Sequence, residues 1–262
     1  LKKIFQYLSS DQQQRLAGIG LAQPDKISKW GEVFGVDSNI LSQWDDVNII
    51  DEIKNLAPQY EVIRMNDVYA ACLSELFLGN PNKHTDFLYI YLGTFIGGAI
   101  VLNGQLFNTD QLNASSIGTI PIHTSGGHRQ LIGVASLNSL EQDLKKTGFD
   151  AKLLTMEKEL PPAVRLMFDS WLEHALEGIK WSIVSVNSVI STNLVFLDGH
   201  LSKNLLSEIN NKLRNLLDDF HWEAIEPTTI ESGSIGKQAR ALGSAIIPFN
   251  SVYGLSQSTL LK

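Results

Sequence analysis

Blocks of apolar residues separated by small and polar ones run along the chain, most clearly between residues 86 and 104, DFLYIYLGTFIGGAIVLNG. An aromatic and β-branched run from Phe87 to Leu92 enters a turn of small residues at 93–98, and a second apolar run at 99–102 leaves it. This pattern predicts a strand, a glycine turn and a second strand. Because glycine permits positive φ and a close approach of the backbone, the turn can aim N–H groups at a phosphate or a sugar hydroxyl. It can equally well only close a β-hairpin.

The rest of the chain alternates between apolar residues at helical spacing and short apolar runs. Helices are predicted for part of 1–16 and for 47–55, 66–77, 163–186 and 205–217. Strands are predicted at 16–22, 61–65 and 194–199. Asn66 and Asp67 therefore stand where a strand ends and a helix begins, a place where either residue type serves as a helix cap.

The length and composition limit which classes of protein this chain can belong to. With 262 residues, 44% of them hydrophobic, the chain can form one large domain or two lobes. Cys72 is the only cysteine, which excludes an internal disulfide framework and a cysteine-rich zinc site. No apolar run approaches the length of a membrane span and no signal peptide is visible, so we expect a cytoplasmic protein without a membrane partner. The chain opens on Leu1 rather than Met, which suggests a fragment or a processed product.

The charge balance argues against direct binding of nucleic acid. Lys and Arg number 21 against 28 Asp and Glu, which gives a net charge of −7. Such an acidic chain has no broad electrostatic footprint for DNA or RNA. If the protein acts on DNA, a segment outside these residues must supply the basic surface.

Three motifs follow one another at a characteristic spacing: ND-x-x-AA at 66–71, GT-x-IGG-x-IVLNG at 93–104 and NA-x-x-IG at 113–118. In this order they resemble the ROK family, which groups bacterial sugar kinases with sugar-responsive transcriptional repressors. Weaker similarity extends from about Gly18 to about Pro248.

The resemblance implies an α/β, actin-like ATPase (ribonuclease H-like) fold of two lobes. Residues 1–85 would form a remnant of the first lobe, which we expect to be incomplete. Residues 86–262 would form the larger second lobe with the glycine turn and the dimerisation helices, and its C-terminal helix would be able to pack back on the first lobe.

The resemblance also assigns roles to individual residues. Asp67 would be the general base that takes the proton from a sugar hydroxyl, and Asn66 would bind a neighbouring hydroxyl. The implied ligand-binding residues are Asn66, Asp67, Gly97, Gly98, Ser116 and Thr119. The implied nucleotide-site residues are Gly93, Thr94, Gly233 and Gly236. Lys237 and Arg240 could meet a phosphate at the helix start that follows, or form an ordinary solvated basic turn.

The chain departs from the kinase pattern at several of these places. Ser116 and Thr119 stand where the kinases carry a Glu and a His that grip the sugar, so charge-assisted hydrogen bonds are lost. Ser136 replaces a further sugar-binding Glu, and no Asp-x-Gly-x-Thr phosphate loop is found. The family's zinc motif is reduced to His123 and His128 without thiolates, so no zinc is expected and both histidines are interpreted as solvated or hydrogen-bonded.

These departures favour binding over turnover. The sequence predicts the sugar-binding and oligomerisation region of a ROK-type transcriptional regulator without kinase activity and without a cofactor. It would form a homodimer or tetramer, bind a small sugar or sugar derivative, and reach DNA only through a helix-turn-helix that precedes Leu1. The alternative is an ATP-dependent sugar kinase with Asp67 as general base, which would require ATP and Mg²⁺.

Overall fold

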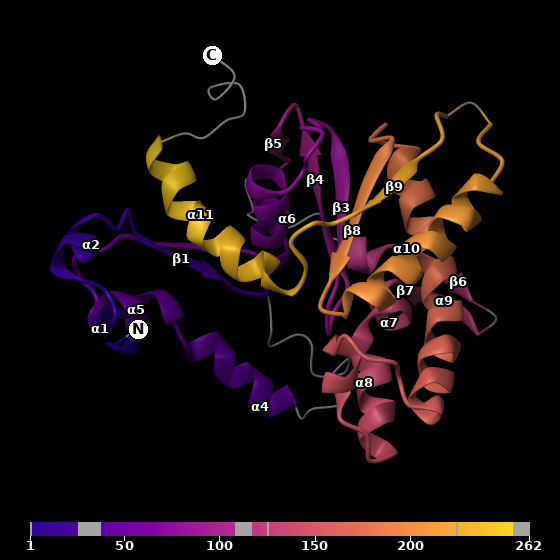
Figure 1. The fold of residues 1–262 in the computed structure, drawn as a ribbon, viewed down its shortest axis with the longest axis horizontal. Coiled ribbons are helices and arrows are strands. Elements are labelled where there is room, and N and C mark those ends of the chain that lie inside the picture. Colours follow the sequence, from indigo (N-terminus) through magenta and orange to yellow (C-terminus); the bar gives the residue numbers. More distant parts are fainter. Residues whose placement is uncertain (1, 26–37, 108–116, 125, 224, 254–262) are drawn as a thin grey trace. The chain divides into compact units, whose positions relative to one another are not determined.

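A computed structural model of the protein describes residues 2–25, 38–107, 117–124, 126–223 and 225–253 (Figure 1). The chain forms two compact units, the first made of residues 1–74 and 239–262 and the second of residues 75–238. It passes from one unit to the other within helix α6 (Asp67–Leu78) and returns just before helix α11 (Ala239–Tyr253). The sequence-based boundary lies between residues 85 and 86, whereas the second unit begins at Glu75 and α11 belongs to the first unit.

The first unit contains a parallel strand pair, β1 (Ile19–Ala22) and β2 (Val62–Met65). The other elements described in this unit are α1 (Lys2–Gln6), α2 (Ser10–Gln14), α4 (Ser38–Ser42), η2 (Gln43–Asp46), α5 (Ile49–Leu56), the start of α6, and α11. Two glycines allow these elements to approach closely. A Cβ on Gly20 of β1 would lie 1.7 Å from the carbonyl oxygen of Ser244, and one on Gly243 would lie 1.6 Å from that of Ala70. Helix α11 therefore packs directly on β1 and α6.

The second unit is built on a five-stranded sheet of order β5-β4-β3-β8-β9. Its strands are β3 (Phe87–Leu92), β4 (Gly97–Leu102), β5 (Gln105–Leu106), β8 (Leu194–Gly199) and β9 (Thr229–Ser232). Strands β3 and β4 pair antiparallel, which confirms the predicted strand, turn and strand, whereas β3, β8 and β9 run parallel. The carboxyl ends of β3, β8 and β9 therefore meet at one edge of the sheet, the edge at which α/β folds commonly place polar residues and ligands.

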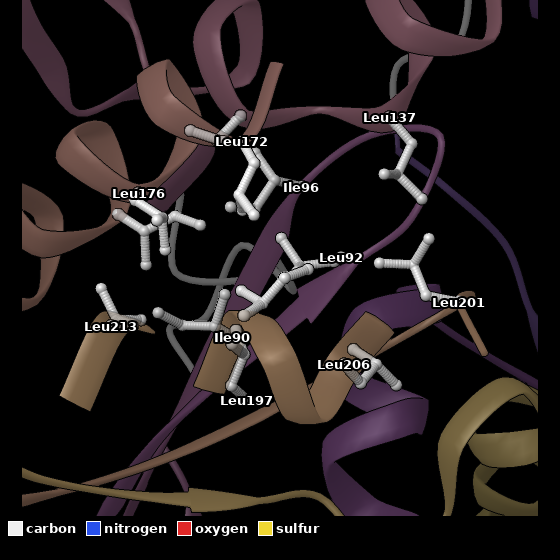
Figure 2. Packing of buried hydrophobic residues seen from close by; sticks show 14 of the residues in the cluster. Ile90, Leu92, Ile96, Leu137, Leu172, Leu176, Leu197, Leu201, Leu206 and Leu213 are labelled. Carbon is white, nitrogen blue, oxygen red and sulfur yellow. The ribbon is translucent and has the colours of Figure 1, made fainter. Parts of the chain in front are cut away.

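Helices α9 (Pro162–Asn187) and α10 (Lys203–Asp218) lie on the same side of this sheet (Figure 1). Figure 2 shows Ile90 and Leu92 of β3 and Leu197 of β8 packed among leucines of α9 and α10. Each fully buried side chain of this size contributes roughly 1.5–3 kcal/mol to folding. The apolar spacing of 163–186 and 205–217 predicts both helices, and the structure confirms them within a few residues of their ends.

Smaller elements complete the second unit around this core. They are η3 (Ile117–Thr119), the hairpin of β6 (Pro121–Thr124) and β7 (Gly127–Gln130), α7 (Ile132–Ala135), α8 (Leu137–Lys146), η4 (Ala151–Thr155) and η5 (Gly236–Gln238). Over the described part of the chain, no helix combines the length and the apolarity needed to cross a membrane.

Candidate functional site

A pocket of about 350 Å³ lies within the first unit, where β1, α6 and α11 come together. Its volume falls in the range of small-molecule sites, roughly 300–1,000 Å³. It is lined by Gly20, Leu21, Ala22, Pro24, Asp67, Arg240, Ala241 and Ser244. Most of this wall is backbone and small side chains, so the charge of the lining comes from Asp67 and Arg240. The pocket thus contains Asp67, the general base of the kinase alternative, and Arg240, for which the sequence left a phosphate contact and a solvated basic turn both open.

Asp67 and Arg240 form an ion pair in this pocket. Arg240 Nη1 lies 3.4 Å from Asp67 Oδ2, and the two side chains are 40% and 16% exposed, respectively. Burial raises the pKa of Asp67, and this outweighs the opposing effects of the Arg240 charge and hydrogen bond and of the Val68 N–H. The carboxylate is therefore poorly hydrated and depends on Arg240 for compensation of its charge.

Asn66 holds the start of α6 in place. Its Oδ1 accepts hydrogen bonds from the backbone N–H groups of Val68 at 3.0 Å and Tyr69 at 3.4 Å, which satisfies donors that a helix start leaves unpaired. Its Nδ2 donates to Asp25 Oδ2 at 2.8 Å, and Asp25 also pairs with Arg64. The helix-cap interpretation of Asn66 is thus realised, and its binding of a sugar hydroxyl stays a prediction.

Sequence reasoning missed Asp25 and Arg64. Asp25 follows β1 and Asn66 follows β2, two strands that pair in parallel. Because neighbouring parallel strands end at the same edge, this adjacency would have followed once the pairing of β1 with β2 was known.

The predicted glycine turn in the second unit is bound to helix α8. The carbonyl oxygens of Gly93 and Thr94 accept hydrogen bonds from the N–H groups of Leu137 at 3.1 Å and Asn138 at 3.0 Å. These are donors of the first turn of α8, which would otherwise lack partners. The Thr94 hydroxyl also bonds Glu141, whose pKa is raised by burial. The turn therefore anchors a helix, and its role at a nucleotide stays a prediction.

Ser136 has a structural role where the family resemblance expects a sugar-binding carboxylate. The side chain is 3% exposed. Its Oγ accepts a hydrogen bond from Ile96 N–H at 3.0 Å, and its carbonyl oxygen accepts one from Trp171 Nε1 at 3.0 Å. Ser136 thereby links the glycine turn to helix α9.

Gly97 and Gly98 lie in strand β4, beyond the turn itself. A Cβ on Gly98 would lie 2.4 Å from Ile117 Cδ1 and 2.7 Å from the Tyr89 carbonyl oxygen, so a glycine is needed there for packing. Thr119 lies exposed at the end of η3. Ser116 lies outside the described residues, so its place relative to these groups stays a prediction.

The loop that contains Gly233 and Gly236 is tied to the interior of the second unit. Gly233 N–H donates to a carbonyl oxygen of β8 at 2.9 Å. Ser234 N–H donates to Glu75 Oε2 at 2.9 Å, and Gly236 N–H donates to Asp198 Oδ2 at 3.0 Å. Both carboxylates are 0% exposed. A nucleotide phosphate would have to displace these acceptors, and the role of Gly233 and Gly236 at a nucleotide stays a prediction.

Asp198 is the central acceptor of this arrangement. It receives hydrogen bonds from Tyr89 Oη at 2.9 Å and from the Gly199 N–H at 2.7 Å, in addition to the one from Gly236. Burial raises the pKa of Asp198, and the three hydrogen bonds oppose that rise. The buried charge of Glu75 adds to the increase. Neither Glu75 nor Asp198 was singled out as a site residue from the sequence, because Tyr89, Ser234 and Gly236, which donate to them, lie far away along the chain.

The two histidines of the lost zinc motif face each other across the β6–β7 hairpin. His123 and His128 are cross-strand partners with ring centroids 5.1 Å apart, and both are exposed. Within the described ranges, no group of three or more His, Cys, Asp or Glu side chains is arranged to hold a metal ion.

Comparisons with known proteins place the chain in a family. The model of the ROK family matches residues 1–249. The chain belongs to the ROK family. The structure resembles the crystal structure of the ROK hexokinase from Thermus thermophilus with a TM-score of 0.57 and 20% identity, covering 79% of this chain and 73% of that one. The fold is thus the actin-like ATPase fold of the ROK sugar kinases.

Other relatives of this ROK chain include both a kinase and a regulator. It is 33% identical to a glucokinase of Halalkalibacterium halodurans over 112 residues, which are 43% of this chain. The matched segment spans about a third of that glucokinase (33%). A ROK family transcriptional regulator, a homolog of the E. coli MLC protein, superimposes with a TM-score of 0.52 and 18% identity, covering 79% of this chain and 56% of that one.

Proposed function

We propose that this ROK chain binds a small sugar or sugar derivative as an effector and does not phosphorylate it. The observation that carries the proposal is the ion pair between Asp67 and Arg240 in the pocket of the first unit. A general base needs an acceptor oxygen that is open to the substrate hydroxyl, whereas Asp67 Oδ2 faces the Arg240 guanidinium, which opposes part of the rise that burial causes in the pKa of Asp67.

The pocket chemistry supports a polyhydroxylated ligand. A carboxylate accepts hydrogen bonds and a guanidinium donates them, and a sugar hydroxyl does both. The Asp67–Arg240 pair therefore offers complementary partners to adjacent hydroxyl groups. Small wall residues such as Gly20 and Ala22 leave room for a ring against the backbone.

The second unit offers further support for binding without phosphoryl transfer. The N–H group of Gly236, a predicted nucleotide-site residue, and that of Ser234 are held by buried carboxylates. Ser136, at the position of a family sugar ligand, is committed to packing. Under the proposal neither ATP nor Mg²⁺ nor zinc takes part.

The proposed role is that of the effector-binding and oligomerisation region of a cytoplasmic transcriptional regulator. A homodimer or tetramer would carry DNA-binding segments outside these residues, and the sugar would shift the equilibrium between DNA-competent and DNA-incompetent arrangements. The existence of a ROK transcriptional regulator with this fold supports the proposal.

A sugar kinase is the second candidate function. Its support is the glucokinase relative at 33% identity and the position of Asp67 at the start of a helix, with a pKa raised by burial. It would require ATP and Mg²⁺, and Asp67 would have to leave Arg240 to act as a base. The loop at 233–236 would also have to exchange its carboxylate partners for phosphate.

The two functions are separated by measuring turnover and binding on the same full-length protein. ADP release is followed in a coupled assay across a panel of hexoses with ATP and Mg²⁺, and sugar binding is followed by thermal shift, because a ligand of the native state raises the melting temperature. We expect sugar-dependent stabilisation without ADP release. Robust turnover that Asp67→Ala abolishes and the exposed-surface control Lys54→Gln retains would establish the kinase instead.

A further inference from the structure

Helix α9 and the segment after helix α10 bring three aromatic side chains together at the surface of the second unit. Phe220 packs edge to face against Trp181, with ring centroids 5.8 Å apart, and against Trp222, with centroids 4.9 Å apart. Phe220 and Trp222 are partly buried against the hydrophobic core, and Trp222 Nε1 donates to the Leu217 carbonyl oxygen at 2.9 Å. Trp181 is 43% exposed. These three rings form the aromatic patch, and rigidly held, exposed tryptophans are typical of interface hot spots.

The segment that carries two of these rings is acidic. Between Arg214 and Lys237 the sequence contains five Asp or Glu residues and no Lys or Arg. In Figure 1 this segment runs from the end of α10 to β9 and beyond. Four of its carboxylates belong to exposed residues, Asp218, Asp219, Glu223 and Glu226. The rings of the segment are therefore accompanied by a local excess of negative charge.

The cations that precede this segment on α10 have partners of their own. Lys212 Nζ pairs with Glu208 Oε1 at 2.8 Å. Arg214 donates to the Ile230 carbonyl oxygen at 3.0 Å and to Asn211 Oδ1 at 3.3 Å. Both side chains are thus directed to groups other than the four exposed carboxylates, so a cation from outside would find those carboxylates accessible.

Lys180 shows within the protein how a cation binds beside the aromatic patch. Its Nζ lies 5.1 Å from the centroid of the Trp181 ring and 2.8 Å from Glu177 Oε2. The ammonium group contacts the face of an indole and a carboxylate together, and both attract a cation. Phe220 and Trp222 stand in the same short segment as the four exposed carboxylates, so this part of the surface combines the same two kinds of group.

We infer that the aromatic patch and the four exposed carboxylates form a docking surface for a basic, arginine-containing segment of a partner protein. The cationic side chains of that segment bind against the rings and beside the carboxylates, as Lys180 does. This inference goes beyond the proposed function and does not depend on it. Every residue of the docking surface belongs to the second unit, whereas the pocket assigned to the sugar lies in the first.

The sign of the charge decides between possible occupants. Nucleic acids and membranes with anionic lipids are negatively charged and would be repelled. A second copy of the chain would bring the same carboxylates to the interface, and like charges that face each other across an interface are unfavourable. A basic segment has the complementary sign. Arginine suits the surface better than lysine because its planar guanidinium also stacks on aromatic rings.

The test measures the binding of labelled peptides to the full chain by fluorescence anisotropy. The probes are matched peptides in which serine and glycine separate arginines, lysines or glutamates. We expect the arginine peptide to bind in low salt with a Kd below about 100 μM, the lysine peptide to bind less tightly, and the glutamate peptide not to bind. About 1 M NaCl, which shortens the Debye length to about 3 Å, should weaken binding about tenfold or more.

Two sets of charge variants locate the site. Neutralising the four exposed carboxylates should weaken binding of the arginine peptide about tenfold or more, because each contributes attraction to a cation nearby. The variant carries Asp218→Asn, Asp219→Asn, Glu223→Gln and Glu226→Gln. The control changes the net charge equally at exposed residues elsewhere and should keep the affinity within about twofold, because distant charges are screened. It carries Asp45→Asn, Asp46→Asn, Glu52→Gln and Glu159→Gln.

The contribution of the rings is tested separately. Trp181→Leu keeps an apolar side chain and removes the indole, so it should weaken binding about three- to fivefold, the factor of an exposed cation–π contact. Leu166→Ala, which shortens a 72% exposed side chain near the other end of α9, should leave binding unchanged. Circular dichroism verifies that each variant is folded. If Trp181→Leu does not fold, Trp181→Phe, which keeps a smaller ring, should weaken binding about twofold.

Four results would overturn the inference. The first is that the arginine peptide does not bind, or that the glutamate peptide binds equally well. The second is that both sets of charge variants weaken binding to the same extent, which would show attraction to the acidic chain as a whole. The third is that replacing Trp181 leaves the affinity unchanged. The fourth is that sedimentation velocity reveals dimers of the chain that Trp181→Leu dissociates, which would make the surface a contact between copies.

Discussion

Replacing Tyr89 by Phe isolates one hydrogen bond in the interior of the second unit. The Tyr89 hydroxyl donates to Asp198 Oδ2 at 2.9 Å, and both residues are 0% exposed. The substitution removes the donor and leaves the ring, so it creates little cavity. What is lost is one of three hydrogen bonds to a buried carboxylate, the others coming from the N–H groups of Gly199 and Gly236.

The magnitude follows from the charge of the acceptor. A hydrogen bond to a charged group contributes about 1.5–3 kcal/mol, more than one between neutral groups. We expect Tyr89→Phe to lower the free energy of unfolding by about 2 kcal/mol. At about 2–4 °C per kcal/mol for a unit of this size, the melting temperature should fall by roughly 4–8 °C.

The deficit should also depend on pH. Burial raises the pKa of Asp198 above its ordinary 3.8, so the folded state binds more protons than the unfolded state, and this group's contribution to stability falls as pH rises through the folded pKa. The Tyr89 hydroxyl opposes that increase. Its removal raises the pKa of Asp198 further, so the difference between wild type and variant should grow as pH rises.

Urea unfolding followed by near-ultraviolet circular dichroism, between pH 4.5 and 8, measures both effects. Tyr91→Phe serves as a second buried tyrosine in the same strand. A deficit below about 0.5 kcal/mol, the lower end for any net hydrogen bond, would refute the strength assigned to this contact. A deficit that shrinks as pH rises would refute the inference that the Tyr89 hydroxyl stabilises the ionised form of Asp198.

Three further changes test other parts of the structure. The pKa of Glu208 is about 2, lowered from 4.5 chiefly by its hydrogen bond with Arg165. Glu208→Gln should therefore lower the free energy of unfolding in urea by about 1 kcal/mol at pH 7, a value reduced because the pair is partly exposed to solvent. The loss should become smaller as pH falls from 4.5 towards 2. Gly98→Ala should cost about 1–3 kcal/mol in the same assay because its Cβ meets Ile117 and a backbone oxygen. Asp25→Ala should lower the melting temperature by a few degrees, about 1 kcal/mol, because it breaks the ion pair with Arg64 and the hydrogen bond from Asn66 Nδ2. An unchanged melting temperature would mean that these contacts do not stabilise the first unit.

The parts of the fold that the sequence predicted well are those with a local signal. The run from Phe87 to Leu102 predicts the β3–β4 hairpin because aromatic and β-branched residues flank a small-residue turn, and the structure confirms it. The apolar spacing from Ala163 onward predicts helix α9 because a helix with one buried face repeats every 3.6 residues. Neither inference requires knowledge of a distant partner.

The site was less predictable because its contacts join distant segments. Arg240 and Asp67 are 173 residues apart, and Ser234 and Glu75 are 159 apart. No spacing rule links such pairs. The family resemblance indicated Asp67 and the loop at 233–236 as candidate site residues. It did not indicate that Asp67 would pair with Arg240 or that the loop would donate hydrogen bonds to Glu75 and Asp198.

The two charged arrangements differ in a way that decides where a ligand can compete. Glu75 and Asp198 are fully buried and accept several short hydrogen bonds, so displacing them would leave charges without partners in the interior. The Asp67–Arg240 pair lies in a pocket, its Arg240 side chain is 40% exposed, and the contact of Arg240 Nη1 with Asp67 Oδ2 is long at 3.4 Å, so a ligand in the pocket can reach both charges. Changes at Asp198 should therefore alter stability without altering sugar affinity. Changes at Arg240 should alter sugar affinity without altering stability. A shared effect of both on sugar binding would contradict the assignment of the ligand to the pocket of the first unit.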